Sequence, residues 1–340
     1  MIDLRSDTIT KPSEDMRKAM YNAEVGDDVF KEDPTVNKLE EYAAELLGKE
    51  SALFVTSGVM GNQICLNLLT EPGDEVICEI DSHIFNYESG SPAKLSGIQL
   101  NPIEGKFGVF TAEQAESKIR PIDAYYMPRT KVIEVENTHN RAGGTIWPIE
   151  KILSLKEVVI KYDLKYHLDG ARIWNACLAT GISAAEYASH FDTISCCLSK
   201  GLGAPVGSLI AGNNGMIKEA YRIRKSWGGG MRQAGVLAAA GLFALKNNFS
   251  RLIEDHINAK YLAEEIAAIS SVQINLETVQ TNIVMFKPIK MDAGEVIEQA
   301  KQNGLLISTV KPGWIRAVTH LDVTKDDIKK AAQILKKVLK

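Results

Sequence analysis

A lysine in a glycine-containing turn is the first residue in this sequence that could perform covalent chemistry. Lys200 follows the apolar run 193–198 and precedes Gly201. A lysine amine placed just past a buried strand shifts its pKa readily and can attack an aldehyde as a neutral nucleophile. A lysine in an ordinary surface turn has the same local sequence, so Lys200 by itself decides nothing.

An acidic residue at the end of another apolar run gives Lys200 a chemical context. Asp169 directly follows the run 165–168, and Arg172 comes three residues later. A buried carboxylate needs a cationic partner. The protonated ring nitrogen of pyridoxal 5′-phosphate (PLP) is such a partner, because its charge keeps the ring an electron sink. The alternative is that Asp169 caps a helix and pairs with Arg172 at the surface.

Two further segments could hold other parts of the same cofactor. Ser57, Gly58 and Val59 lie where an apolar run passes through a small-residue turn into a helical pattern. Backbone N–H groups at such a helix start can cradle a phosphate. His83 follows a different apolar run, and its imidazole could stack on a ring or accept a proton. A plain tight turn and a loop histidine are the structural alternatives for these two segments.

These side chains need elements that bring them together. Helices are expected to begin near Ser13 and at Asp33-Pro34, the second one ending at Gly48. From Ser51 onward, short apolar runs alternate with helical patterns, which is typical of βαβ units around a mostly parallel sheet. The predicted strands are 52–55, 75–80, 131–135, 165–168 and 193–198, and the predicted helices are 60–69 and 149–162. Ligands of such sheets lie at the carboxyl ends of the strands, where the residues above would meet.

The pattern changes toward the C-terminus. A helical run over about 231–268 is followed by predicted strands at 272–276, 282–286, 306–310 and 315–318 and predicted helices at 293–302 and 325–339. We therefore predict an α/β protein of two domains. Residues 1–250 would form the large domain, including an N-terminal arm, and residues 251–340 a smaller α+β domain.

Composition narrows the function classes. The net charge of −4, with acidic and basic residues interspersed, leaves no electrostatic footprint for nucleic acid or an anionic membrane, so a small-molecule partner is expected. Five cysteines without C-x-x-C spacing argue against a disulfide framework or a zinc site, and no metal ligand set is predicted. The N-terminus lacks the pattern of a signal peptide, and no apolar stretch is long enough to span a bilayer. A cytoplasmic location is expected.

At this point the chain resembles the low-specificity threonine aldolases, PLP enzymes of the aspartate-aminotransferase fold (fold type I). The resemblance runs nearly from end to end, and few families combine its motifs in this order. The motifs are L-R-S-D-T at 4–8, V-G-D-D-V at 25–29, E-D-P-T at 32–35, E-N-T-H-N at 136–140, L-D-G-A-R at 168–172, L-S-K-G at 198–201, G-G-G-M-R-Q at 228–233 and I-R-A-V-T-H at 315–320.

The resemblance implies a function and a set of site residues. The enzyme would cleave L-threonine or L-allo-threonine, which are β-hydroxy-α-amino acids, to glycine and an aldehyde. It would be a homotetramer built as a dimer of dimers, with a large seven-stranded-type sheet in its main domain. Lys200 would attach PLP, Asp169 would pair with the ring nitrogen, and His83 would stack on the ring. Ser57, Gly58 and Val59 would bind the cofactor phosphate, and Arg232 would reach the phosphate in a neighbouring subunit's site. Ser6, Arg172 and Arg316 would bind the substrate carboxylate.

Two positions depart from the family pattern. Tyr126 stands where the family usually has a histidine thought to contact the substrate hydroxyl. Phe30 replaces the tyrosine of a G-D-D-V-Y motif, which removes a hydroxyl near the cofactor. Both are predicted to affect substrate preference more than the reaction type.

Three other functions are compatible with parts of the sequence. A β-eliminating lyase or an aminotransferase of the same fold would share the lysine, the aspartate and the cradle, since a fold does not determine a function. A PLP-fold binding or regulatory module without catalysis would bind the cofactor and leave amino acids unconsumed. A nicotinamide dehydrogenase would need a G-x-G-x-x-G after its first strand, which is missing here.

Overall fold

The computed structural model describes all 340 residues and is organised around a mixed sheet of seven strands. The strand order is β2-β8-β7-β6-β5-β3-β4, and only β8 runs antiparallel to its neighbours. The strands are β2 (Ser51–Val55), β3 (Asp74–Glu79), β4 (Gln99–Ile103), β5 (Arg129–Glu136), β6 (Lys165–Asp169), β7 (Thr193–Cys197) and β8 (Ser208–Gly212). The expected mostly parallel sheet is thus confirmed.

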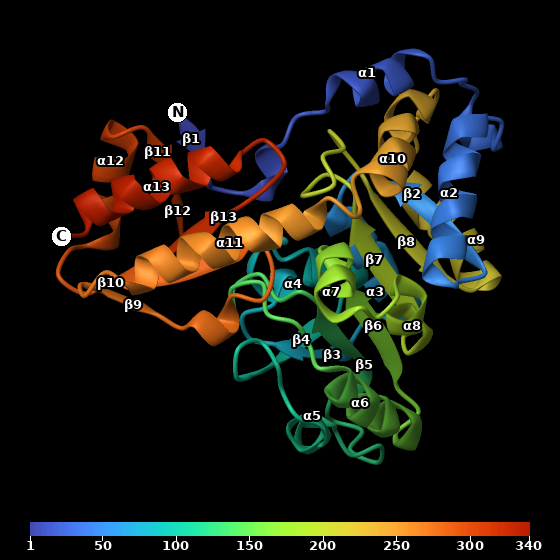
Figure 1. Cartoon of the computed structure of the whole chain (residues 1–340). Helices are drawn as coiled ribbons and strands as arrows, with labels where there is room; N and C mark the ends of the chain where they lie inside the picture. The colour runs from blue at the N-terminus through green and yellow to red at the C-terminus, as the bar shows by residue number, and fades with distance from the viewer.

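Helices cover both faces of this sheet (Figure 1). One face packs against α3 (Gly58–Leu69) and α9 (Asn214–Ser226). The helices of the main hydrophobic core are α2 (Pro34–Leu47), α6 (Ile149–Lys161), α7 (Ile173–Thr180), α8 (Ala184–Ser189) and α10 (Gly235–Asn247), with α1 (Glu14–Tyr21) against α10. Two short helices, α4 (His83–Asn86) and α5 (Ala112–Lys118), connect strands. Burial on both faces explains why the strands are continuous apolar runs.

Local sequence sets where these helices begin and end. The side chains of Ser13 and Asp33 accept hydrogen bonds from backbone N–H groups in the first turns of α1 and α2. Gly48 ends α2 with a φ of +58°, a left-handed conformation that glycine adopts without a steric penalty. Ser57 caps α3 in the same way as Ser13 caps α1.

A second layer is built from the C-terminal part of the chain and the first residues. Its antiparallel sheet has the order β12-β13-β10-β9, with β9 (Val272–Ile274), β10 (Ile283–Pro288), β12 (Ser308–Lys311) and β13 (Trp314–Val318). The helices α11 (Leu252–Ala267), α12 (Ala293–Gln302) and α13 (Lys325–Val338) pack on it around a separate hydrophobic core. The first strand, β1 (Ile2–Asp3), pairs with β11 (Leu305–Leu306).

The connection between the two parts differs from the sequence prediction in detail. The helix expected over 231–268 is two separate helices, because the residues between the end of α10 and the start of α11 are not helical. Figure 1 shows α11 running from the large sheet toward the C-terminal layer. Leu4 packs in the second core although it lies in the N-terminal arm. The domain boundary at residue 250 stays a prediction.

Most predicted elements are present within two residues of their expected bounds. The strands β1, β4 and β8 and the helices α4, α5, α7, α8 and α9 were not predicted. None of the helices combines the length and the apolar character that crossing a bilayer requires.

Candidate active site

Three predicted site residues lie at the carboxyl edge of the large sheet, as parallel strands require. His83 begins α4 just after β3, Asp169 ends β6, and Lys200 lies in the turn after β7. Ligand-type atoms of His83 and Asp169 are within 4.8 Å of each other. The parallel register of β5, β6 and β7 aligns these strand ends. The sheet topology therefore gathers side chains that are more than a hundred residues apart in sequence.

The buried carboxylate of Asp169 has neutral donors and no cation from this chain. Asn62 Nδ2 donates to Asp169 Oδ2 at 2.7 Å, and the backbone N–H of Ala171 donates to Oδ1 at 3.0 Å. No lysine or arginine forms an ion pair with it. A carboxylate held in this way is suited to a positively charged ring nitrogen. Arg172, the alternative ion-pair partner, pairs elsewhere.

Gly58, in the predicted phosphate cradle, and Lys200 both lie close to the sulfur atom of Cys197. Lys200 Nζ lies 3.3 Å from Cys197 Sγ. A Cβ added to Gly58 would lie 2.9 Å from the same sulfur, so only glycine fits at this approach. Ser57 caps α3, which leaves the first N–H groups of the helix, at Gly58 and Val59, outside the intrahelical ladder. This is the donor set that a phosphate binds.

The imidazole of His83 is anchored from behind by a residue that the sequence did not suggest. Its Nδ1 lies 2.8 Å from Glu88 Oε1, and Glu88 is fully buried. Burial alone would lower the pKa of His83, but the carboxylates of Glu88, Asp169 and Glu136 raise it above its ordinary value. The ring is therefore a strong proton acceptor at the edge of the site.

Arg172 is held by a buried bidentate ion pair with Asp7. Its Nε and Nη2 donate to the two carboxylate oxygens at 2.7 Å each, and Asn282 Nδ2 adds a third bond at 3.2 Å. Burial alone would raise the pKa of Asp7, but Arg172, with help from Lys200, holds it well below its usual range. Thr10 Oγ1 also donates to the carbonyl of Lys200. The N-terminal arm thus positions both Arg172 and the lysine turn.

A second guanidinium faces the same region. Arg316, on β13, donates to Asn140 Oδ1 at 2.8 Å and to the carbonyl of Arg5 at 3.2 Å. Burial and the nearby charge of Arg172 lower its pKa. A buried and a half-buried cation that repel each other favour an anion between them. Ser6, next to Arg5, caps a short 3₁₀ turn with its hydroxyl.

Three residues with predicted contacts are exposed in the single chain, and one of them lies at the opposite edge of the sheet. Tyr126 precedes β5 and is 74% exposed, whereas the cluster lies beyond the other end of the strands. Eight residues of β5, at about 3.3 Å each, separate the two edges by about 25 Å. Phe30 is 69% exposed, and it lies beside Arg232 because the N–H of Asp28 donates to the carbonyl of Arg232. The roles of these three residues stay predictions.

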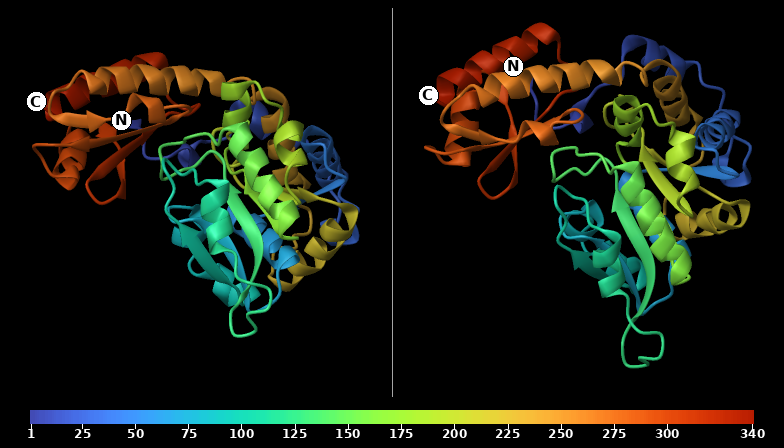
Figure 2. Two further views of the ribbon diagram at one scale, coloured as in Figure 1. Left: turned by 90° about the horizontal axis from the view of Figure 1, so that it is seen from below. Right: turned by 60° about the horizontal axis from the view of Figure 1, so that its bottom comes forward.

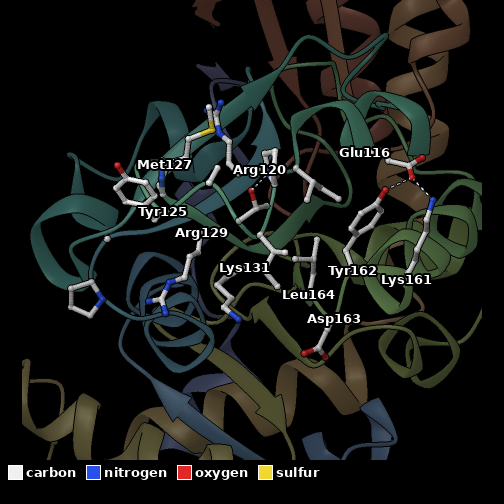
Figure 3. A pocket seen from close by; sticks show the side chains of 18 residues that line it. Glu116, Arg120, Tyr125, Met127, Arg129, Lys131, Lys161, Tyr162, Asp163 and Leu164 are labelled. Atoms are coloured by element: carbon white, nitrogen blue, oxygen red, sulfur yellow. Dashed lines mark hydrogen bonds and ion pairs between the residues drawn. The ribbon is translucent and has the colours of Figure 1, made fainter.

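A large cavity lies at the opposite edge of the sheet from the predicted site residues. It has a volume of about 940 Å³ and is built by the loop before β5 and the end of α6, with Arg120, Tyr125, Arg129 and Tyr162 in its lining (Figure 3). Figure 2 shows this part of the chain protruding from the end of the sheet. None of the predicted site residues lines it.

The chain supplies each group that PLP requires. Lys200 offers an amine, Asp169 an unpaired carboxylate, His83 a flat ring, and the start of α3 a phosphate cradle. The ligand-type atoms of His83, Glu88 and Asp169 also lie within 4.8 Å of one another, and both carboxylates accept hydrogen bonds from Asn62. The donor set therefore fits the organic cofactor.

The fold is that of the fold type I PLP enzymes. The chain superposes along its full length on the solved structure of Leishmania major threonine aldolase, with a TM-score of 0.87, 19% identity and 100% of both chains covered. It also superposes on a variant of Thermus thermophilus aspartate aminotransferase, with a TM-score of 0.74, 16% identity, 100% of this chain and 92% of the other. At these identities the likeness concerns the fold alone.

Sequence comparison identifies the family. Residues 3–288 match the beta-eliminating lyase family model. The low specificity L-threonine aldolase of Escherichia coli is 43% identical over 333 residues, covering 98% of this chain and 97% of that protein. The chain belongs to the beta-eliminating lyase family and, within it, to the low-specificity L-threonine aldolases. The resemblance inferred from the motifs is confirmed, and the protein is a carbon-carbon lyase.

Proposed function

We propose that this protein uses PLP to cleave L-threonine and L-allo-threonine to glycine and acetaldehyde by a retro-aldol reaction. The observation that carries the proposal is the nearly full-length similarity to enzymes named low-specificity L-threonine aldolases. The carboxyl-edge cluster of Lys200, Asp169 and His83 supports it, because a retro-aldol reaction needs a carbonyl cofactor and a base near the β-hydroxyl.

The substrate carboxylate would bind between the two guanidiniums. Arg172 is fixed by Asp7 through its Nε and Nη2, so its Nη1 remains for the substrate. Arg316 is fixed by Asn140 and Arg5. The hydroxyl of Ser6 would contribute a polar contact from the arm. This clamp would set which bond at the substrate Cα stands perpendicular to the cofactor ring, and therefore which bond breaks.

When bound, PLP withdraws the electron pair released at the substrate Cα. Lys200 Nζ would be the amine that holds the cofactor, and Asp169 would accept a hydrogen bond from its protonated ring nitrogen. His83 removes the proton of the β-hydroxyl, directly or through a water, since its raised pKa suits a proton acceptor.

A β-eliminating lyase or aminotransferase with the same cofactor contacts is the alternative. Purified protein loaded with PLP and mixed with L-allo-threonine discriminates the three functions. We expect acetaldehyde, detected with a coupled aldehyde reductase, and no acetaldehyde from a Lys200→Ala variant. A keto acid without acetaldehyde would overturn the aldolase proposal.

We also propose that the protein is a homotetramer in which copies contribute residues to one another's sites. The position of Tyr126 supports this, because it is exposed and lies at the opposite edge of the sheet from Lys200. If Tyr126 contacts the substrate hydroxyl, it does so in another copy. Arg232, bonded to Asp27 and exposed, would likewise reach a neighbour's phosphate.

Subunit complementation tests the shared site. Co-expression of Lys200→Ala and Tyr126→Ala chains produces mixed oligomers. Some sites in these would combine an intact lysine with an intact tyrosine from another copy. We expect activity above the sum of the two separate variants, whereas strictly additive activity would show that Tyr126 acts within its own chain or not at all. A kinetic panel of threonine diastereomers with Tyr126→His tests whether this position sets substrate preference.

A cytoplasmic location is part of the same proposal. It is supported by the five cysteines, all of which are buried and unpaired. Fractionation of cells that produce the protein tests it.

A further inference from the structure

Glu88 is a fully buried carboxylate that receives three side-chain hydrogen bonds at the back of the active site. His83 Nδ1 lies 2.8 Å from its Oε1, Asn62 Nδ2 donates to the same oxygen at 2.9 Å, and Gln63 Nε2 donates to Oε2 at 2.6 Å. None of the sequence motifs includes Glu88, and Asn62 and Gln63 lie in α3, the helix that follows the cradle. Three donors stabilise the ionised form of a buried carboxylate.

Asn62 joins this carboxylate to the one that faces the cofactor. Its Nδ2 carries two hydrogens, one directed at Glu88 and the other at Asp169, 2.7 Å away. The orientation of its amide is set by His167, whose Nε2 lies 3.3 Å from Asn62 Oδ1 and whose Nδ1 lies 2.9 Å from Thr193 Oγ1. Burial lowers the pKa of His167 to about 4, so this ring is neutral and can donate from Nε2.

The other charged groups around His83 and Glu88 have partners or are neutral. Glu136, on β5, accepts the backbone N–H groups of His83 and Asn140. Glu134, two residues earlier, has no hydrogen-bond partner for either oxygen. Burial and the neighbouring carboxylates raise the pKa of Glu134 far above its ordinary value, which favours its neutral form. Glu88 is consequently the carboxylate that contacts the His83 ring through a side-chain hydrogen bond.

We propose that Glu88 is a positioning residue for the aldol cleavage: it holds Nδ1–H of His83, so that Nε2 is the nitrogen facing the substrate, and Asn62 ties it to Asp169 in one hydrogen-bonded unit. The relation is that of a carboxylate that orients a catalytic imidazole and stabilises its protonated form. The inference rests on the proposed role of His83 as the proton acceptor.

The link through Asn62 has a consequence for the order of events. The negative charge of Asp169 contributes to the raised pKa of His83. A cofactor ring nitrogen that is positively charged offsets this contribution. Loading of the cofactor therefore lowers the proton affinity of His83 and increases its neutral, proton-accepting fraction. His83 therefore becomes available as a proton acceptor once the cofactor ring is bound.

Nuclear magnetic resonance of the imidazole nitrogens tests the proposal without any turnover. Protein labelled with ¹⁵N-histidine contains six histidines, and His83 is assigned as the resonance missing from a His83→Phe variant. In the cofactor-free wild type, we expect Nδ1 to carry the proton in the neutral ring. Addition of PLP should lower the pH at which the ring titrates. Protonation at Nε2 in the neutral ring would overturn the assignment, and this measurement needs no variant of Glu88.

Substitution of Glu88 separates its charge from its shape. Glu88→Gln keeps an oxygen that can accept from Nδ1 and removes the negative charge, so the proton affinity of His83 should fall about tenfold or more. Glu88→Asp keeps the charge and should restore most of that affinity. An unchanged His83 titration in Glu88→Gln would contradict the proposal.

The kinetic consequence distinguishes a positioning role from a general structural one. Glu88→Gln should lower kcat more than it raises KM and should move the acid limb of the pH profile to lower pH. A uniform loss of activity at every pH would indicate damage to the fold and would overturn the positioning role. If the His83 titrations follow the expectation but no aldehyde is released from threonine, the proposed function fails while the role of Glu88 toward His83 stands.

Discussion

Asp7→Asn should destabilise the protein strongly, because it leaves the guanidinium of Arg172 buried with half of its partner removed. Both oxygens of Asp7 lie 2.7 Å from Arg172 nitrogens, and both side chains are buried. Removal of one partner from a buried ion pair costs about 3–5 kcal/mol. The amide oxygen of asparagine still accepts one N–H, so we expect about 3 kcal/mol of lost unfolding free energy. Chemical denaturation of cofactor-free protein at matched concentration measures it.

The pH dependence of this difference is a second test. The pKa of Asp7 is lowered in the folded protein by Arg172, against the opposing effect of burial. A group with a depressed pKa contributes stability that is fully present above its unfolded value, about 3.9, and lost as the pH falls through the folded value. The gap between wild type and Asp7→Asn should thus be constant from pH 8 to about pH 5 and narrow below about pH 4.

A matched control defines what would refute this reasoning. Glu116→Gln removes an exposed ion pair with Lys161 and should leave the denaturation midpoint unchanged. If Asp7→Asn shifted the midpoint no more than Glu116→Gln, the buried pair would not anchor the arm. Because Arg172 would also lose its fixed orientation, kcat/KM for L-allo-threonine should fall about tenfold to hundredfold.

Four further predictions concern this site and the sheet that carries it. Gly58→Ala should weaken PLP binding about tenfold in an absorbance titration, because the new Cβ would crowd Cys197 at 2.9 Å, while Gly215→Ala at the start of α9 should not. Glu134→Gln should leave the unfolding free energy at pH 8 unchanged or higher. Burial raises the pKa of Glu134 in the folded protein, so at a pH above the unfolded pKa the carboxyl ionises more readily in the unfolded chain, and this favours unfolding. By contrast, Glu75→Gln should lose about 2 kcal/mol in the same denaturation experiment, because Glu75 is bonded to Arg120 and Asn101. The kcat/KM profile should rise through the pKa of His83, which its carboxylate neighbours raise despite burial, and His83→Asn should remove that limb.

Much of the site was predictable because it follows from the sheet. Alternating apolar runs identified the strands, and parallel strands must end at one edge, so Lys200, Asp169 and His83 could be placed together from sequence. The cradle at Ser57 could also be placed, because small residues between a strand and a helix have few other uses. The family motifs then supplied the reaction.

What the sequence could not give depends on contacts between distant segments. Asp7 lies in the L-R-S-D-T motif at 4–8, but only the structure shows that it pairs with Arg172, 165 residues later. Glu88 is five residues from His83, a spacing with no helical or strand periodicity to indicate a contact. Tyr126 was assigned by alignment alone, and β5 places it at the opposite edge of the sheet. Side-chain pairing across the fold has no local sequence signal.

The most direct test of the central claim, C–C cleavage at a site built on Lys200, is the reaction of L-allo-threonine in D₂O followed by proton magnetic resonance. We predict acetaldehyde and glycine in equal amounts, with one solvent deuterium at the glycine Cα, and no reaction with Lys200→Ala protein. Formation of a keto acid in place of glycine, or cleavage that survives the loss of Lys200, would contradict the account.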